Sequence, residues 1–392
     1  MTVFLVSSFI KLVVVFTAIM VGVALLTLAE RRICAWMQDR LGPNRVGPQG
    51  LLQPAADGLK NILKEETYPA QADFWMFVLA PVMSFVPALL TFAVIPFAGP
   101  LRTPWGVVPM VVADLPVGFL YILAVGSLGV YGIALAGWSS NNKYALLGGL
   151  RACAQMISYE IALGLSTVAV LLLAGNVTLS EVVAKQSGSL LQWNVFPLTL
   201  GFFIFVIAAF AETNRLPFDL PEAEGELIAG YHTEYSAMKF SMFYIAEYSN
   251  MVTASALMAT LFFGGWGIPF VHWDTANGLN LLQTLATLIA FTVKVLFFLF
   301  LYIWVRWTLP RFRYDQLMAL GWKVMLPFAL LYLTVLAAAI WYLHAALGWA
   351  YDARFALALF ALNIALAVPL FWVLDRGRIV SGTAALPQGG EA

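Results

Sequence analysis

VFLVSSFIKLVVVFTAIMVGVALLTLA, residues 3–29, is an apolar stretch with a single charged side chain, Lys11. About 20 predominantly apolar residues in a helix cross the hydrocarbon core of a bilayer, so this stretch is long enough to span a membrane. It has no basic segment before the apolar run, exceeds the length of a signal-peptide core, and ends in AERR rather than in small residues. We therefore expect it to be retained as a transmembrane helix.

Apolar stretches of this kind recur along nearly the whole chain. Of 392 residues, 61% are hydrophobic and 11% are charged, whereas soluble domains carry about 25% charged residues. This composition excludes a water-soluble enzyme, and the formal net charge of zero gives no basic surface for nucleic acid. We predict an all-α polytopic membrane protein with about nine transmembrane helices. They are expected at residues 3–29, 74–97, 117–137, 155–175, 195–211, 240–263, 281–305, 325–347 and 352–374.

The basic residues indicate how these helices are oriented. Most Lys and Arg residues fall on the connections after the first, third, fifth and seventh spans and in the C-terminal tail. The opposite side carries only Arg102, Lys185 and Arg354. Because cytoplasmic loops are enriched in Lys and Arg, we expect the N-terminus outside and the C-terminus inside.

We expect a single transmembrane domain, residues 1–392, because no connection is long enough to hold a separate catalytic domain. Two inner connections stand out: a first loop at residues 30–73 and an acidic loop at 212–239. Residues 352–392 form an additional C-terminal helix and tail. Any chemistry must therefore take place in the membrane or on a partner.

The chain lacks the residue spacings that mark common cofactor sites. Cys34 and Cys153 are far apart and have no CxxC spacing, and no Walker A, GxGxxG or HExxH motif occurs. We expect free thiols and no nucleotide, haem or metal site.

The first inner loop contains a predicted amphipathic helix. Two Gly-Pro pairs favour turns within residues 42–48, and apolar residues then recur at helical spacing. These residues are Leu52, Ala56, Leu59 and Leu63. Such a helix lies at the inner membrane surface, and a helix that only seals the bundle against lipid headgroups would have the same pattern.

The acidic loop runs against the basic bias of its side, because Arg215 is the only Lys or Arg between Ala211 and Tyr235. Its carboxylates are Glu212, Asp219, Glu222, Glu224, Glu226 and Glu234. Asp219 and Pro221 favour the start of a helix whose first turn would carry acidic residues. Crowded carboxylates hold protons more tightly, so the loop could pass protons or pair with arginines of a partner. A solvated acidic face is the simpler alternative.

The ionisable residues well inside the later predicted spans are Glu160, Glu247 and Lys294. Each charge at the centre of a bilayer costs about 2.5–3.5 kcal/mol or more, so such residues usually face the bundle interior and mark a proton or ion path. Both glutamates are expected roughly 12 Å into the membrane from the inner side. A neutral glutamate that hydrogen-bonds two helices together is the structural alternative. Lys294 would be a proton-relay member or a counter-ion, and Lys11 is expected to extend outward.

These features outline a polar route from the inner surface into the bundle. It would include the inner ends of the first and fifth spans, at Glu30 and Glu212, the acidic loop and the two intramembrane glutamates. The outer half carries no comparable set. Alternating access needs an exit as well as an entrance, so the one-sided route favours a subunit that passes charge to a neighbour over a self-contained transporter.

Six ordered blocks of the sequence carry a resemblance to a known family. They are AERR, MQDRLGPNRVGPQGLLQPAADGLK, GWSSNNKYALLGGLRACAQMISYE, AETNRLPFDLPEAEGELIAGYHTEYS, IAEYSN and WVRWTLPRFRYDQLMALGWK. The chain resembles the quinone-site membrane subunit of respiratory complex I, or NADH:quinone oxidoreductase, which is called the H subunit in bacteria and subunit 1 in mitochondria. Ala55, Asn61 and Gly225 depart from the family pattern without affecting a polar site residue.

The resemblance implies a fold and a set of partners. Spans 2 to 6 would resemble half of an antiporter-like subunit, and the two inner loops would frame a chamber for the ubiquinone or menaquinone headgroup. Quinone would be the substrate, reduced next to the terminal iron-sulfur cluster of a hydrophilic partner, and this chain would bind no redox cofactor. FMN and the iron-sulfur clusters would lie on partner subunits. Further partners would be small and antiporter-like membrane subunits and membrane lipid, in the bacterial cytoplasmic membrane.

The resemblance also assigns roles to residues at matching positions. Those contributing to the chamber or its support would be Glu30, Arg31, Arg40, Gln53, Asp57 and Phe218. Those on the glutamate-rich path linking quinone reduction to proton pumping would be Glu160, Glu212, Glu222, Glu224, Glu226 and Glu247. Lys294 joins this path from the charge analysis alone.

Two alternatives remain at this point. The related membrane subunit of an energy-converting hydrogenase shares the ancestry but lacks a quinone chamber, and the full AETNRLPFDLPEAEGE block argues against it. An independent secondary transporter is the second alternative, and it should function when purified alone. Complex I can also take electrons from ferredoxin or another donor, since electron input occurs on other chains.

Overall fold

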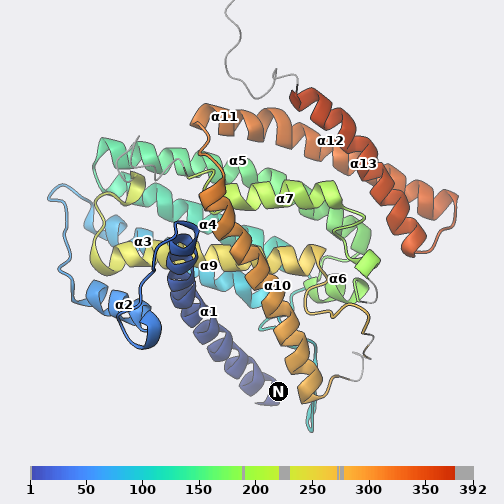
Figure 1. The fold of residues 1–392 in the computed structure, drawn as a ribbon, viewed down its shortest axis with the longest axis horizontal. Helices are drawn as coiled ribbons and strands as arrows, with labels where there is room; N and C mark the ends of the chain where they lie inside the picture. The colour runs from blue at the N-terminus through green and yellow to red at the C-terminus, as the bar shows by residue number, and fades with distance from the viewer. Residues whose placement is uncertain (1, 188–189, 220–229, 272, 274–277, 376–392) are drawn as a thin grey trace, which may run out of the picture.

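The computed structural model describes residues 2–187, 190–219, 230–271, 273 and 278–375, and these are predominantly α-helical (Figure 1). Within this part of the chain, seven helical stretches are long and apolar enough to cross a membrane. They are Val6–Met37, Phe74–Val94, Gly118–Ser139, Lys143–Ala174, Leu281–Thr308, Tyr314–Ala346 and Ala353–Trp372. The predicted fold class, an all-α polytopic membrane protein, is confirmed.

The other two predicted spans also coincide with helices. α7, Thr199–Glu212, is apolar but has only 14 residues. At 1.5 Å per residue it extends about 21 Å, less than the ~30 Å hydrocarbon core. α9, Ala237–Phe262, is long enough but carries Lys239 and Glu247. Nine crossings, and the orientation of the chain, remain predictions.

The remaining bounds complete the element order. The other long helices are α1 Thr2–Met37, α3 Phe74–Leu90, α4 Gly118–Ser139, α5 Lys143–Ala174, α10 Leu281–Thr308, α12 Leu326–Trp341 and α13 Ala353–Asp375. The short helices are α2 Gln53–Leu63, α6 Leu179–Lys185 and α11 Tyr314–Ala319. Short 3-10 turns are η1 Pro48–Gly50, η2 Thr91–Val94, η3 Leu190–Gln192 and η4 Gly230–His232. Two π-helical segments are η5 Leu320–Met325 and η6 Tyr342–Ala346.

Two helices extend beyond their predicted limits on the predicted inner side. α1 continues to Met37 rather than ending at residue 29, so the start of the predicted first loop is helical. α5 begins at Lys143 rather than at 155, after Asn142, whose side chain accepts a hydrogen bond from a first-turn N–H. With 32 residues, α5 is about 48 Å long and exceeds the hydrocarbon core. Polar residues at these ends lower the local hydropathy. Helix limits predicted from apolar runs therefore ended too early in α1 and began too late in α5.

A short hairpin follows η2 on the predicted outer side. β1, Leu101–Thr103, pairs antiparallel with β2, Gly106–Val108, and neither strand was predicted. Lys11 of α1 reaches the connection after β2, where its ammonium donates to the carbonyl oxygens of Pro109 at 3.1 Å and Val111 at 2.7 Å. This lysine therefore also joins α1 to the outer loop.

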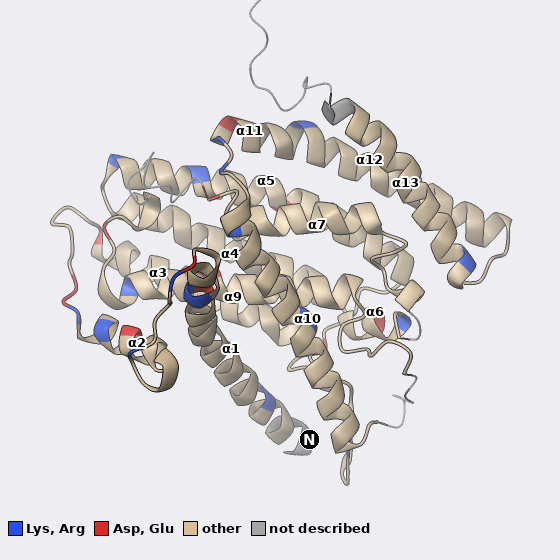
Figure 2. Ribbon diagram, viewed as in Figure 1, with Lys and Arg blue, Asp and Glu red and all other residues tan. Residues whose placement is uncertain are grey.

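The long helices fall into three groups in Figure 1. α3, α4, α5, α7 and α9, which correspond to predicted spans 2 to 6, run roughly parallel and contact one another in sequence order or across the bundle. α1 and α10 are steeply inclined to them, and α12 and α13 lie beside α5 and α7. Figure 2 shows that the helices carry long uncharged stretches, with charged residues mostly toward their ends.

The α3 and α4 contact requires a residue without a side chain. A Cβ placed on Gly132 of α4 would lie 2.8 Å from the carbonyl oxygen of Ala80 and 2.2 Å from Oγ of Ser84, both on α3. Real Cβ atoms do not approach other atoms this closely. Small residues at helix crossings allow such backbone contacts in membranes, where van der Waals packing drives helix association.

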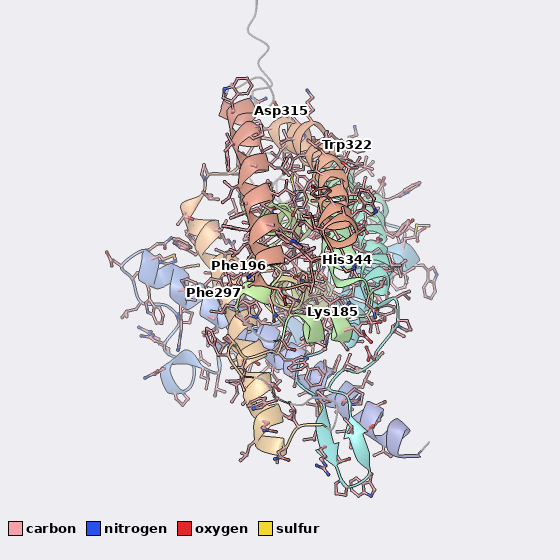
Figure 3. All side chains as sticks on the ribbon, turned by 90° about the vertical axis from the view of Figure 1, so that its right-hand side faces the viewer. Lys185, Phe196, Phe297, Asp315, Trp322 and His344 are labelled. Carbon is pink, nitrogen blue, oxygen red and sulfur yellow. The ribbon has the colours of Figure 1, made fainter. Side chains whose placement is uncertain are left out.

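The helical stretch Tyr314–Ala346 contains both π-helical segments, and its course can be followed in Figure 3 from Asp315 to His344. The segment Leu320–Met325 packs on α5, where Trp322 donates its indole N–H to Ser158 at 3.0 Å. The hydroxyl of Tyr159 donates to the carbonyl oxygen of Leu317 at 2.9 Å. A π-helical turn leaves a mid-helix carbonyl without its usual α-helical partner, and side chains of a neighbouring helix can then bind the backbone.

The ninth predicted span is attached to the bundle by one buried asparagine. Asn363 of α13 is 2% exposed and accepts a hydrogen bond from the N–H of Leu200 at 3.1 Å. Its amide also donates to the carbonyl oxygen of Pro197 at 2.8 Å. The first N–H groups of a helix lack partners within the helix, so Asn363 supplies one for the start of α7.

We expect Asn363→Leu to lower the stability of the protein, because two buried backbone groups at the start of α7 would lose their partner. Leaving such groups unsatisfied costs about 1–3 kcal/mol. The unfolding midpoint of the detergent-solubilised protein can be followed with a thiol-reactive dye, since Cys34 is a buried free thiol. Leu357→Ala, on an exposed face of the same helix, is the control. Equal midpoints for the two variants would contradict the role of Asn363.

Candidate functional site

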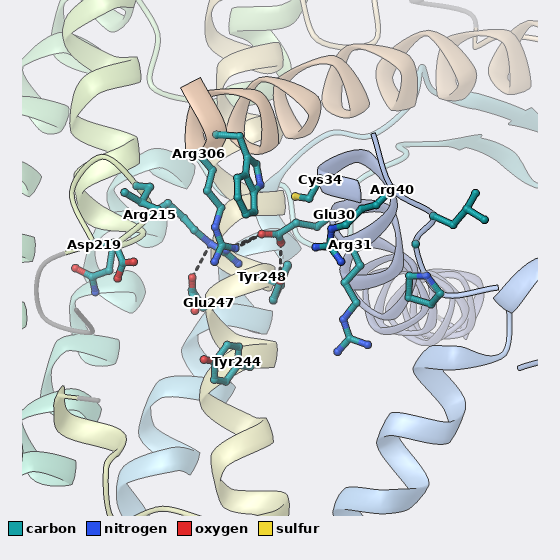
Figure 4. Close-up of a pocket in the computed structure, with 16 residues that line it drawn as sticks. Glu30, Arg31, Cys34, Arg40, Arg215, Asp219, Tyr244, Glu247, Tyr248 and Arg306 are labelled. Carbon is teal, nitrogen blue, oxygen red and sulfur yellow. Dashed lines mark hydrogen bonds and ion pairs between the residues drawn. The ribbon is translucent and has the colours of Figure 1, made fainter. Parts of the chain in front are cut away.

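A cavity of about 610 Å³ opens where α1, α9 and α10 meet the loop after α7 (Figure 4). Its charged and polar lining residues are Glu30, Arg31, Arg40, Asn214, Arg215, Asp219, Tyr244, Glu247, Tyr248 and Arg306. Cys34, Leu41, Gly42, Pro43, Leu216 and Trp307 complete the wall. The lining thus combines several charges of both signs with aromatic and apolar surface.

Glu30, near the C-terminal end of α1, is 6% exposed and has three partners. The hydroxyl of Tyr248 donates to Oε2 at 2.5 Å, and Nη1 of Arg215 donates to Oε1 at 3.3 Å. Arg306 of α10 also donates to Oε1. A buried carboxylate is stable only when it is paired and hydrogen-bonded, and this one is held from three separate elements.

Arg215 binds a second carboxylate. Its Nε lies 2.6 Å from Oε1 of Glu247, and the guanidinium stacks over the ring of Tyr248 at 4.5 Å. The Arg215 and Glu247 side chains are 8% and 13% exposed. Burial alone would lower the pKa of Arg215, but Glu247 and Glu30 raise it above its usual value, so the guanidinium stays charged. One arginine therefore holds two carboxylates from different helices.

Asp219 occupies the end of the described loop after α7. Its Oδ2 lies 3.3 Å from Nη2 of Arg311, which follows α10. Burial raises the pKa of Asp219, and the positive charges of Arg311 and Arg306 offset part of that rise. This carboxyl group thus takes up a proton more readily than an exposed aspartate.

The six residues predicted for the chamber separate into two sets. Glu30, Arg31 and Arg40 line the cavity, whereas Gln53, Asp57 and Phe218 do not. Arg31 binds Asp57 of α2 at 2.6 Å, and Gln53 donates to the same carboxylate at 3.0 Å.

Phe218 lies in the buried core beside the cavity. Its ring is 5% exposed and packs between Tyr159 and Phe312, with ring centroids 5.8 and 5.6 Å apart. The second set thus lies outside the lining, where Asp57 joins α2 to Arg31 of the wall and Phe218 packs in the core.

Glu160 and Glu212 lie near enough for their charges to interact. Glu160 of α5 accepts a hydrogen bond from Ser127 of α4. Glu212 lines a separate cavity of about 50 Å³. Its other polar lining residues are Thr91, Thr213, Asn250 and Thr253. A polar cavity of this size has room for water, which can connect hydrogen-bonding groups.

Lys294 lies apart from these carboxylates. Its ammonium donates to the carbonyl oxygens of Phe263 at 2.7 Å, Gly265 at 2.8 Å and Gly267 at 2.7 Å, just after α9. It also lies over the ring of Trp193 at 4.6 Å. In the described part of the chain it forms no ion pair. Its position is that of a cation at a helix C-terminus, which does not fit the expected counter-ion to a buried glutamate.

Glu222, Glu224 and Glu226, and the predicted helix start at Pro221, lie outside the described residues. Both ends of this segment are described. Phe218 and Asp219 precede it, and η4, Gly230–His232, follows it and packs against α5.

Several lining residues were not identified from the sequence as part of the site. Arg306, Tyr248, Tyr244 and Trp307 lie in or next to two of the six sequence blocks, IAEYSN and WVRWTLPRFRYDQLMALGWK. The blocks marked these regions as significant, but sequence spacing alone does not bring residue 306 to residue 30. Only the crossing of α1 and α10 does so.

Comparison with known proteins agrees with this architecture. A model of the NADH dehydrogenase family matches residues 10–337. The NADH-quinone oxidoreductase H subunit of Leptospira biflexa is 50% identical over 350 residues, covering 87% of this chain and 96% of that protein. An NADH-quinone oxidoreductase H subunit of Geobacter metallireducens is 51% identical over 325 residues, covering 83% and 94%. The corresponding protein of Salinibacter ruber is 51% identical over 323 residues, covering 81% and 91%. On this match over most of its length, the chain belongs to the NADH dehydrogenase family.

Proposed function

We propose that this chain is the membrane subunit of a proton-pumping NADH:quinone oxidoreductase, respiratory complex I. It forms part of the chamber for the quinone headgroup and part of the path that couples quinone reduction to proton translocation. The named relatives support this function over an energy-converting hydrogenase subunit or an independent transporter. The organisms of these relatives support a location in the bacterial cytoplasmic membrane.

The proposed partners follow from the named relatives, which are H subunits of NADH-quinone oxidoreductases. In such an assembly, electrons would reach quinone from the terminal iron-sulfur cluster of a hydrophilic subunit, with FMN and the other clusters farther away on partners. Small and antiporter-like membrane subunits would continue the proton path, and the substrate is ubiquinone or menaquinone.

The cavity suits a quinone headgroup in size and chemistry. Ligand cavities commonly measure about 300–1,000 Å³ and combine apolar walls with a few placed polar groups. Trp307 and Tyr244 offer flat apolar surface to a ring, and Arg31 and Arg40 can donate hydrogen bonds to its carbonyl oxygens. Reduction of a quinone to a quinol takes up two electrons and two protons. The reaction therefore changes the charge and proton demand of the cavity.

The observation that carries the proposal is the pairing of Arg215 with both Glu30 and Glu247. A charge that forms in the cavity competes for the same guanidinium, so it weakens one of these pairs. A carboxylate that loses its partner in a buried site holds a proton more tightly. Arg215 is three residues from Glu212, so this change is transmitted toward the Glu212 and Glu160 pair. Proton uptake at these carboxylates would be the first step of coupling.

The assignment is tested by what the chain associates with in its native host. We expect the tagged chain, after gentle solubilisation, to migrate on a native gel with a large assembly that oxidises NADH with a quinone analogue. This activity should be sensitive to a quinone-site inhibitor, and mass spectrometry should identify the partner subunits. Migration alone, or with a nickel-iron hydrogenase, would contradict the proposal.

Glu247→Gln should reduce quinone reductase activity about tenfold, equivalent to about 1.4 kcal/mol of transition-state stabilisation. The amide keeps the shape and places an acceptor oxygen beside Arg215, but it cannot carry the proton or the charge. Proton pumping in vesicles should fall with it, while assembly on a native gel stays intact. Glu181→Gln, the same change at an exposed position of α6, is the control. Full activity and pumping in the Glu247 variant would remove this residue from the path.

The acidic loop is tested by changing Glu222, Glu224 and Glu226 together to Gln. Because these carboxylates are proposed to pass protons, the variant should lose quinone reductase activity without losing membrane insertion or assembly. Activity and the number of protons moved per electron are the measurements, with Glu65→Gln on the exposed first loop as control. Normal coupling would mean that these carboxylates form only a solvated acidic face.

A further inference from the structure

Gln155 of α5 lies outside the cavity wall but is fully buried, with 0% exposure. Its Nε2 lies 2.8 Å from the carbonyl oxygen of Ala211 and 2.9 Å from that of Phe218. The same nitrogen lies 3.0 Å from Oδ1 of Asn214. One side-chain amide thus donates to both ends and to the middle of a single turn.

The turn that Gln155 holds carries Arg215. It begins in the last turn of α7, at Ala211, and ends at Phe218, next to the acidic segment. Asn214 adopts a left-handed backbone with φ of 50°, a conformation in which asparagine is more common than other residues with a side chain. The backbone closes on itself through a bond from the N–H of Phe218 to the carbonyl oxygen of Arg215 at 2.8 Å. The direction in which Arg215 leaves the loop therefore depends on this turn.

The chemistry of the site selects an amide donor. All three partners of Gln155 are acceptors, and the two hydrogens of the NH₂ group serve them. A carboxylate at this position would place another acceptor against them, and an apolar side chain would remove the donor that all three share. The loop would then keep its sequence but lose the bonds that fix its shape.

We propose that Gln155 is a positioning residue for the quinone site. It fixes the turn 211–218 so that Arg215 reaches Glu30 and Glu247 at the same time. This inference rests on the proposed function of the cavity. It adds a residue outside the cavity wall that affects the cavity only through the position of Arg215. Releasing the turn would let the guanidinium leave Glu247, and it would slow turnover while the cavity still admits quinone.

The experiment replaces Gln155 by Met, which has a similar length and shape but no donor. Gln186→Met is a matched control, because Gln186 is 2% exposed and donates to the carbonyl oxygens of Val182 and Thr260 near the predicted outer end. Both variants lose buried hydrogen bonds, but only the first adjoins the Arg215 turn. Each is measured in the complete assembly for native-gel migration, for NADH oxidation with a soluble artificial acceptor, and for kcat and KM with quinone.

We expect Gln155→Met to lower kcat for quinone about tenfold, with KM changed less than threefold and with normal oxidation of NADH by the artificial acceptor. Gln186→Met should retain the kcat of the unchanged protein. A purely structural role would make the two variants behave alike, and equal kcat values would overturn the proposal. If the chain is not a quinone-site subunit, the assembly with the unchanged protein would itself show no quinone-dependent activity. Failure of the proposed function can therefore be distinguished from failure of the positioning role of Gln155.

A double variant tests whether Gln155 acts through Arg215. If Gln155 serves only to hold Arg215 on Glu247, Gln155→Met combined with Glu247→Gln should lose no more activity than the more impaired single variant. If the activity losses of the two single variants instead multiply in the double variant, Gln155 does not act through the Arg215–Glu247 pair. Gln155→Asn keeps the amide on a side chain shorter by one methylene, and it should assemble and show a smaller loss of kcat. If neither Gln155 variant assembles, the residue is required for folding and the positioning role is wrong.

Discussion

The structure depends on one guanidinium group that is almost completely withdrawn from water. Arg215 brings Glu30 of α1 and Glu247 of α9 to the same point, and Arg306 of α10 completes the balance of charge. None of these groups would be stable there alone, because an unpaired charge in a buried site costs several kcal/mol. The three helices α1, α9 and α10 therefore meet where their charges can be neutralised. The cavity is the space left beside this meeting point, so its shape and its charge have the same origin.

This arrangement also explains why the site lies at one end of the helices rather than at their centre. The cluster forms where α1 and α10 run past the bundle and where the loop after α7 supplies backbone groups and side chains together. Other buried polar groups satisfy backbone instead. Asn363 binds the start of α7, and Lys294 binds three carbonyl oxygens after α9. Among the described residues, some buried polar groups thus hold helix ends, whereas the carboxylates Glu30 and Glu247 share a cation beside a cavity.

The sequence was sufficient to predict the helices but not the contacts between them. Apolar runs predicted segments that all coincide with helices, and the unusual positions of Glu160 and Glu247 were evident from their apolar surroundings. The predicted helix limits were wrong where polar residues continue a helix beyond its apolar run, as at the start of α5. Lys294 was placed with the glutamates because both are charges within apolar runs, yet a lysine can satisfy carbonyl oxygens that a glutamate cannot. The partnership of Glu30 with Arg306 depends on a helix crossing, which no local pattern encodes.

Within one and a half turns, α5 presents Gln155 to the Arg215 turn, Ser158 and Tyr159 to the helix of α11 and α12, and Glu160 to α4. Successive helical residues are separated by about 100° around the axis. Inserting or deleting a single residue between Gln155 and Glu160 would therefore turn one set of contacts away while leaving the other in place. Side chains elsewhere on this helix can be exchanged without that effect, but the length of this short segment cannot change. The number of residues between Gln155 and Glu160 therefore fixes the position of the Arg215 turn relative to Glu160 and Glu212.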